Sequence, residues 1–330
     1  MLKRILPLII GLVLILVAEI GQMVNSLFIR EWFYTIVWWG YILSVDGIIY
    51  LVRKNSLIIN RPRSFLLMLP WSITIWLVFE LYNIRLQNWA YANVTPVLIE
   101  RWLGYALSFA TVLPAIFETV TLLEIIFRQW LERIPPLKFT ISPKAWRVIF
   151  WGGIILLIIP LLLPQYLFPL VWVSFILILE PLIHRQGGSA SLTALSVPKG
   201  GISLIARGNL RKVIILFAAG LACGILWEFW NWQARTRWIY TIPYFNFGKI
   251  FEMPILGYLG FLPFAWECYI MYQFVVLNGY SRPLGEETGI NLIKLSPPRK
   301  YVIISYIFLI VFMLSMFALM DMVTVRSVLP

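Results

Sequence analysis

Apolar runs of about 20 residues dominate the sequence, and they restrict the chain to one class of fold. A run of this length crosses the hydrocarbon core of a bilayer as an α-helix. Hydrophobic residues make up 61% of the 330 residues and charged residues 13%, a balance that excludes a soluble domain. We therefore expect an all-α, polytopic bundle of about nine transmembrane helices in an integral membrane protein. The predicted spans are 5–28, 32–52, 64–83, 102–127, 148–163, 167–183, 213–231, 254–277 and 301–322.

The charged residues between these runs predict the orientation of the helices. The net charge is +12, but the basic residues are spread over the connections between spans and form no basic domain, which argues against nucleic-acid binding. With a cytoplasmic N-terminus, 20 of the 27 Lys and Arg residues fall on the cytoplasmic side. This asymmetry follows the positive-inside rule. We expect a cytoplasmic N-terminus and an extracytoplasmic C-terminus, in the cytoplasmic membrane of a prokaryote.

Few residues suit metal or nucleophilic chemistry. The two cysteines, Cys223 and Cys268, fall inside predicted spans, and the single histidine, His184, falls in a basic loop. Paired haem ligands, a zinc centre and a Ser-His-Asp triad each need imidazoles that this chain lacks. The sequence also has no Walker A loop, no GxGxxG and no DxxxD pair for a magnesium-bound diphosphate. We expect neither a metal nor a cofactor.

Polar and aromatic residues recur in the same order in two parts of the chain. Each part holds four predicted spans, so both enter the membrane in the same direction. We expect two tandem four-helix repeats, 1–134 and 135–290, in parallel orientation about a pseudo-twofold axis, and an additional C-terminal helix in 291–330. The first part contains Asp46, Glu80-x-x-Asn83, Trp89-x-Tyr91, Glu100, Gly104-Tyr105 and Pro114-x-x-x-Glu118. The second contains Glu180, Glu228-x-x-Asn231, Trp238-x-Tyr240, Glu252, Gly257-Tyr258 and Pro263-x-x-x-Glu267.

Eight of the 15 acidic residues belong to these repeated pairs. A carboxylate at the bilayer centre costs roughly 2.5–3.5 kcal/mol on insertion scales, which makes such residues functional candidates. Desolvation favours the protonated form, so we expect them to donate protons. Asp46 and Glu180 lie near the cytoplasmic ends of their spans and are followed by arginines, which favours structural pairing. The predicted catalytic acids are Glu118, Glu267, Glu80 and Glu228.

Aromatic and amide side chains accompany the acids in both parts. An aromatic wall beside a carboxylic acid suits the protonation of an alkene, because the resulting carbocation lies over π faces. An alternative is that the acids only hold the bundle together and the aromatic residues form interfacial belts. The predicted substrate-binding residues are Asn83, Trp89, Tyr91, Asn231, Trp238, Tyr240, Glu100, Glu252, Trp227 and Trp230.

The duplicated order of a polar residue, a W-x-Y element and a later P-x-x-x-E resembles the membrane lycopene cyclases of the heterodimeric and fused type. In that family two homologous halves each carry an acidic residue before a W-x-Y-like element and a later P-x-E-E. The resemblance implies a carotenoid or other polyisoprenoid substrate that carboxylic acids cyclise without redox change. This chain has one Glu where the family has two acids, and Asn where it has Asp. The matching positions are Asn83, Trp89, Tyr91, Pro114 and Glu118, and Asn231, Trp238, Tyr240, Pro263 and Glu267.

The sequence leaves three functions open. The first is a membrane enzyme that cyclises or isomerises a lipid or polyisoprenoid by acid–base chemistry. The second is a proton- or ion-coupled transporter or a lipid-handling protein. The third is a non-catalytic subunit of a larger membrane assembly. The expected partners are the membrane, a lipid or isoprenoid ligand and, for the third function, other membrane subunits.

Overall fold

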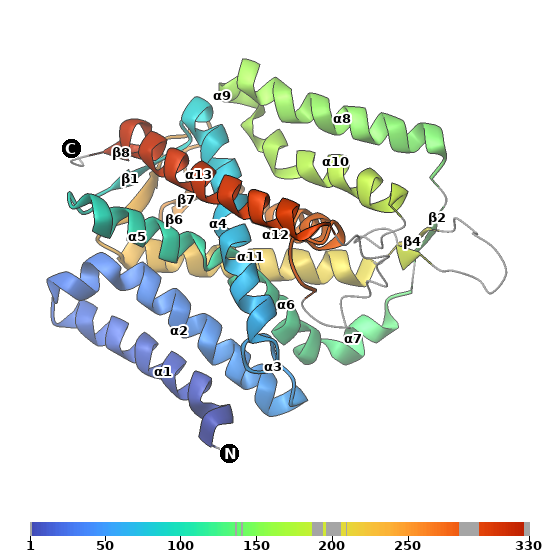
Figure 1. The fold of residues 1–330 in the computed structure, drawn as a ribbon. Helices are drawn as coiled ribbons and strands as arrows, with labels where there is room; N and C mark the ends of the chain where they lie inside the picture. The colour runs from blue at the N-terminus through green and yellow to red at the C-terminus, as the bar shows by residue number, and fades with distance from the viewer. Residues whose placement is uncertain are drawn as a thin grey trace.

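The computed structural model describes residues 2–135, 137–139, 141–186, 194–195, 206–208, 210–283 and 297–326. Within these residues, 9 helical segments are long and apolar enough to cross a membrane, which confirms the expected class of integral membrane protein and the number of spans (Figure 1). Each segment overlaps the span predicted for it. The segments are Ile5–Met23, Leu27–Arg53, Pro62–Leu86, Leu98–Ile126, Pro143–Leu162, Pro164–Arg185, Leu210–Gln233, Ile255–Leu277 and Arg299–Val323.

Most of these segments are single helices, and three are divided. The single helices are α1 (Leu2–Met23), α2 (Leu27–Arg53), α4 (Pro62–Leu86), α8 (Pro143–Leu162), α11 (Leu210–Gln233) and α13 (Arg299–Val323). The divided segments are α5 (Leu98–Phe109) with α6 (Val112–Ile126); α9 (Pro164–Leu167) and η1 (Phe168–Leu170) with α10 (Val171–Arg185); and η2 (Ile255–Gly257) with α12 (Tyr258–Leu277). Two short helices, α3 (Leu57–Asn60) and α7 (Arg128–Arg133), lie in connections.

The break between α5 and α6 has a local cause and a polar partner. Pro114 has no N–H, and its ring clashes with the carbonyl four residues earlier in a regular helix. Ser72 of α4 supports the break, since its hydroxyl donates to the Phe109 carbonyl at 2.7 Å and accepts from the Leu113 N–H at 3.0 Å. The backbone groups at the break are therefore paired inside the bundle, as an apolar environment requires.

The helices pack as a bundle with α6 near its centre. Helix α6 contacts α2, α4 and α11, while α12 contacts α10 and α11. The hairpins α1–α2 and α8–α10 lie on opposite sides, and α13 packs on α4 (Figure 1). Helices α1, α8 and α13 are the least buried, with 17%, 11% and 17% of their apolar windows inside the protein, so they face lipid.

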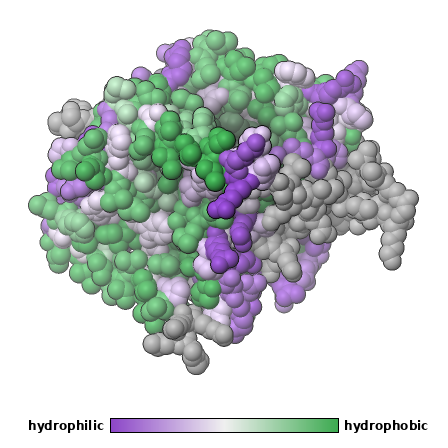
Figure 2. Space-filling model, viewed as in Figure 1, coloured by the Kyte–Doolittle hydropathy of each residue, from purple (hydrophilic) through white to green (hydrophobic). Residues whose placement is uncertain are grey.

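The outer surface matches this placement. Hydrophobic residues cover most of the face seen in Figure 2, and hydrophilic residues are confined to a few patches. Exposed residues on α1, α8 and α13 include Leu16, Ile155 and Phe308, each more than half exposed. A contiguous apolar surface of this kind is suited to contact with the hydrocarbon core of a bilayer.

A small sheet closes one end of the bundle. It consists of β5 (Arg237–Tyr240), β1 (Trp89–Ala92) and β8 (Val325–Arg326) in that order. Strand β1 pairs antiparallel with β5 and parallel with β8. We call this the sheet end; α1 ends and α2 begins there, and Gln22 donates to the Gln233 carbonyl at the end of α11. The remaining strands are β2 (Leu137–Phe139), β3 (Ala194–Leu195), β4 (Ala206–Gly208), β6 (Lys249–Ile250) and β7 (Met253–Pro254).

Candidate functional site

Two asparagines hold the W-x-Y strands against the ends of their helices. Asn83, near the end of α4, donates to the Trp89 carbonyl at 2.9 Å and accepts from the Asn88 and Trp89 N–H groups at 2.9 and 3.2 Å. Asn231, near the end of α11, donates to the Trp238 carbonyl and accepts from its N–H, both at 2.9 Å. Each amide thus satisfies backbone groups that follow a helix end, which explains why Asn recurs three residues after Glu.

One helical turn earlier, Glu80 accepts hydrogen bonds from aromatic side chains. A single oxygen, Oε1, accepts from the Trp76 Nε1 at 3.0 Å, the Trp89 Nε1 at 2.9 Å and the Tyr91 hydroxyl at 2.6 Å. The other oxygen is buried and has no hydrogen-bond partner among the described residues. Such an unpaired buried atom is rare and marks a position under functional or structural demand.

Glu228 makes a similar but shorter network. Its Oε1 accepts from the Tyr240 hydroxyl at 2.7 Å, and that hydroxyl accepts from the Trp238 Nε1 at 3.0 Å. Its Oε2 is also buried without a partner in the described part of the chain. Both glutamates are fully buried. In both networks a tyrosine hydroxyl points at the carboxyl group.

The two networks meet because β1 and β5 pair. In the antiparallel register Trp89 lies opposite Tyr240, and Tyr91 lies opposite Trp238. Residues far apart in sequence therefore form one aromatic surface under the sheet. Cross-strand aromatic pairs of this kind stabilise an antiparallel pair.

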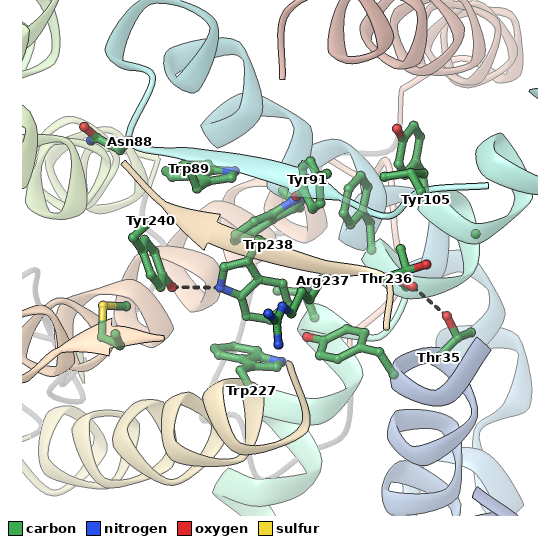
Figure 3. Close-up of a pocket in the computed structure, with 18 of the residues that line it drawn as sticks. Thr35, Asn88, Trp89, Tyr91, Tyr105, Trp227, Thr236, Arg237, Trp238 and Tyr240 are labelled. Atoms are coloured by element: carbon green, nitrogen blue, oxygen red, sulfur yellow. Dashed lines mark hydrogen bonds between the residues drawn. The ribbon is translucent and has the colours of Figure 1, made fainter. Parts of the chain in front are cut away.

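A cavity of about 210 Å³ lies beneath this surface (Figure 3). Its walls come from the strands and from the sheet-end parts of α2, α4, α5, α11 and α12, with Phe168 and Trp172 from the α9–α10 segment. The hydroxyl groups of Thr35 and Ser108 form a hydrogen bond of 2.7 Å within the cavity wall. The tryptophans that line the cavity are Trp32, Trp76, Trp89, Trp172, Trp227 and Trp238. A cavity with these walls suits an apolar ligand.

The predicted site residues divide into three groups. Those that line the cavity are Trp89, Tyr91, Glu100, Trp227, Trp238 and Tyr240. Those that lie behind its wall are Glu80 and Glu228, which bond the lining tyrosines, and Asn83 and Asn231, which hold the strands. The remaining four are Trp230, Glu252, Glu118 and Glu267, none of which is among the cavity's lining residues. Trp230 packs edge-on against Trp38 in the core.

Glu118 and Glu267 lie in the helix interiors. Glu118 hydrogen-bonds Asp46 of α2, which also accepts from Ser56 Oγ and the Ile58 N–H. Glu118 lines a second cavity, of about 60 Å³, whose wall includes Arg61, the residue before α4. Glu267 accepts from the Phe175 N–H at 2.9 Å. The structure therefore does not bring these two acids together with the W-x-Y elements, and their catalytic role stays a prediction.

The phenols of Tyr91 and Tyr240 are held in the neutral form. Burial, and next the adjacent carboxyl group of Glu80 or Glu228, raises the pKa of each tyrosine well above its ordinary value. Both side chains therefore act as O–H donors at any physiological pH. They stand between the acids and the cavity.

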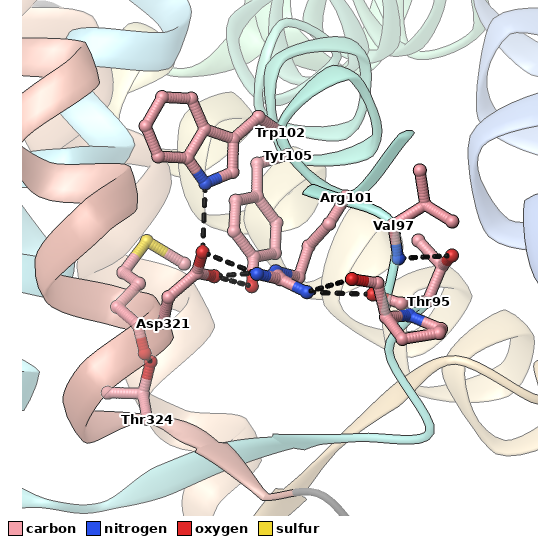
Figure 4. Close-up of polar contacts among 9 residues, drawn as sticks. Thr95, Val97, Arg101, Trp102, Tyr105, Asp321 and Thr324 are labelled. Atoms are coloured by element: carbon pink, nitrogen blue, oxygen red, sulfur yellow. Dashed lines mark hydrogen bonds and ion pairs between the residues drawn. The ribbon is translucent and has the colours of Figure 1, made fainter. Parts of the chain in front are cut away.

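An ion-pair network missed in the sequence borders the same cavity (Figure 4). The carboxylate of Asp321 in α13 accepts hydrogen bonds from Nε and Nη2 of Arg101, both at 2.8 Å. It also accepts from Trp102 Nε1 at 2.9 Å and from the Tyr105 hydroxyl at 3.1 Å. Nη1 of Arg101 also donates a hydrogen bond to the Thr95 carbonyl. The network ties α13 to α5, and an acid near the end of an otherwise apolar 25-residue helix was the signal for it.

Comparison with known proteins supplies no relative: no protein-family model, curated protein or solved structure matches the chain. Among the described residues, no cluster of three His, Cys, Asp or Glu side chains is placed to hold a metal ion.

Proposed function

We propose that this integral membrane protein binds an elongated apolar lipid in the aromatic cavity, and that the lipid is a polyisoprenoid. The observation that carries the proposal is the cavity itself: tryptophans from four helices and two strands line it. Rigid indole walls suit a chain of conjugated or isolated double bonds better than they suit a hydrated solute. The sequence resemblance to the lycopene cyclases supports the same class of ligand.

Acid–base chemistry on the bound chain is the second part of the proposal. In the structure the hydroxyl of Tyr91 or Tyr240 donates to Glu80 or Glu228. For proton transfer this hydrogen bond reverses: the hydroxyl accepts the proton of the carboxylic acid and gives its own proton to an alkene carbon. The resulting carbocation lies against the indole faces. Loss of a proton from a neighbouring carbon to the same Tyr–Glu pair restores the acid. The net change is an isomerisation or cyclisation, with no oxidant or reductant.

The ligand is identified by extracting the purified protein with organic solvent and analysing the extract by mass spectrometry and absorbance. A carotenoid, quinone or other long isoprenoid in stoichiometric amount is the expected result. An extract that contains bulk phospholipid alone would contradict the proposed ligand class and would favour transport or a subunit role.

The acid–base step is tested with the extracted compound as substrate. Glu80→Gln and Glu228→Gln keep an oxygen that accepts from the aromatic donors but remove the transferable proton, so both variants are expected to bind and not convert the compound. Glu132→Gln, at an exposed residue of α7, is the control. Undiminished conversion by both Glu80→Gln and Glu228→Gln would disprove the assignment.

We also propose the repeat and the orientation as part of this account. The Asn–strand and Glu–Tyr contacts of the two W-x-Y elements support the division into 1–134 and 135–290, with 291–330 added after them. Residues 291–296 and 327–330 of the last unit lie outside the described residues. The distribution of Lys and Arg supports a cytoplasmic N-terminus and an extracytoplasmic sheet end.

A further inference from the structure

One cation on the cavity wall is almost unpaired. Arg237 belongs to β5, and its side chain lines the aromatic cavity with Trp227 and Trp238 (Figure 3). Its Nε is buried and has no hydrogen-bond partner in the described part of the chain. Its Nη1 reaches the Trp232 carbonyl at 3.4 Å, which is a long contact. A guanidinium carries five N–H donors, so most of its hydrogen-bonding capacity is unused.

The second arginine on this wall, Arg101, has hydrogen-bond partners for most of its guanidinium. Arg101 binds Asp321 through two nitrogens and donates to the carbonyls of Thr95 and Pro96. No ion pair joins Arg237 to an acid among the described residues. Arg237 is half-buried, so the contrast within one cavity leaves its guanidinium open to a partner from outside the chain.

The acids that face the same cavity limit where an anion can lie. Glu31 and Glu100 are on its wall; Glu31 is the fifth residue of α2, and Glu100 lies in the first turn of α5. Glu100 is exposed, and it accepts from Thr95 at 3.2 Å. Neither pairs with Arg237. Both carboxylates repel an anion, so Arg237 on β5 is the expected position for an anionic group in this cavity.

We propose that the ligand of the cavity is an amphiphile whose anionic group, a phosphate monoester or a carboxylate, binds the guanidinium of Arg237. The inference rests on the proposed lipid-binding function and specifies the polar end of that ligand. Phosphate and carboxylate oxygens match the fork of a guanidinium in pairs. Trp227 and Trp238 line the cavity together with Arg237 and offer apolar surface to the rest of the ligand. The isoprenoid or acyl chain fills the rest of the cavity.

The test compares three probes that share one chain: geranylgeranyl phosphate, geranylgeranoic acid and geranylgeraniol. Binding to the purified protein in neutral detergent is followed by quenching of tryptophan fluorescence. Hydrogen bonds to charged groups contribute about 1.5–3 kcal/mol, so the preferred anion is expected to bind at least about tenfold more tightly than the alcohol. The relative affinities of the first two probes distinguish a phosphate from a carboxylate head.

Arg237→Gln is expected to abolish this preference and leave binding of the alcohol within about twofold, because only the charged contact is lost. Arg235→Gln is the matched control, since Arg235 is two residues away and exposed. Arg237→Lys keeps the positive charge but lacks the planar fork of N–H donors, so it is expected to retain part of the preference. This variant replaces Arg237→Gln in the test if the glutamine variant does not fold.

The outcomes separate the two proposals. Equal binding of all three probes to the wild-type protein would overturn the anionic head and leave the lipid-binding function standing. A preference that survives Arg237→Gln would overturn the role of Arg237. No binding of any probe would instead count against the proposed function itself.

Discussion

At the scale of single residues, each carboxyl group near the sheet end is defined by its hydrogen-bond donors. Glu80 and Glu228 accept hydrogen bonds from tyrosine hydroxyls, while Asp321 forms a bidentate ion pair with a guanidinium. The first two suit a carboxyl group that gives and takes a proton, and the third suits a permanent carboxylate. We therefore propose that acidic residues serve two purposes at the sheet end, proton transfer at Glu80 and Glu228 and structural pairing at Asp321.

The Arg101–Asp321 pair provides a stability test. Each side chain is 16% exposed, so Asp321→Asn leaves a largely buried guanidinium without its counter-charge. We expect a loss of about 2–4 kcal/mol in the free energy of unfolding, since breaking a buried pair by removing one partner costs about 3–5 kcal/mol and this pair keeps some solvent. Unfolding in mixed detergent micelles measures it.

The control for that change is an exposed pair. Arg128 and Glu132 on α7 have side chains that are 77% and 61% exposed. Glu132→Gln is expected to change the free energy of unfolding by less than about 1 kcal/mol, because solvent screens such pairs. Equal effects of the two substitutions would contradict the structural role of Asp321.

At the scale of elements, the sequence predicts the helices better than it predicts their interruptions and the site. Hydrophobic runs identify every span, because the length of an apolar run is set by the bilayer. The strand at Trp89–Ala92 was not predicted, since four residues carry too little alternation and its partner is distant in sequence. The break at Thr111 and the pairing of Asp321 depend on Ser72 and Arg101, which only tertiary packing brings there.

The contact between α11 and α12 makes a second prediction. A Cβ atom at Gly220 would lie 2.1 Å from the Phe261 carbonyl oxygen, so Gly220→Ala has to push the two helices apart. We expect a lower unfolding temperature in detergent, from a loss of about 1–3 kcal/mol. Gly152→Ala on α8 is the control; nothing lies within 4 Å of its Cβ position, and alanine favours a helix. A Gly220→Ala variant as stable as wild type would contradict close packing of α11 on α12.

At the scale of the whole molecule, the two ends of the bundle differ. The sheet end carries the aromatic cavity, whereas the opposite end carries the small cavity lined by Arg53, Arg61 and Lys212. If the basic end lies in the cytoplasm, as we propose, the proposed ligand would enter the aromatic cavity from the outer half of the membrane.

Cysteine labelling in intact cells checks this orientation. Both native cysteines are buried, so a single introduced cysteine reports alone. Pro96→Cys at the sheet end is expected to react with a membrane-impermeant maleimide, and Asn55→Cys after α2 is expected to react only in opened cells. The reverse pattern would show that the N-terminus is outside.

The central claim is that an isoprenoid-like lipid occupies the aromatic cavity, and blocking that space tests it most directly. Gly104 lines the cavity, and nothing lies within 4 Å of its Cβ position, so Gly104→Leu fills empty space without a backbone clash. Gly152→Leu, equally uncrowded on the lipid-facing helix α8, is the matched control. Lipid extracted from equal amounts of each protein is quantified by mass spectrometry. We predict that Gly104→Leu loses the co-purifying isoprenoid and Gly152→Leu retains it; equal isoprenoid in both variants would contradict the claim.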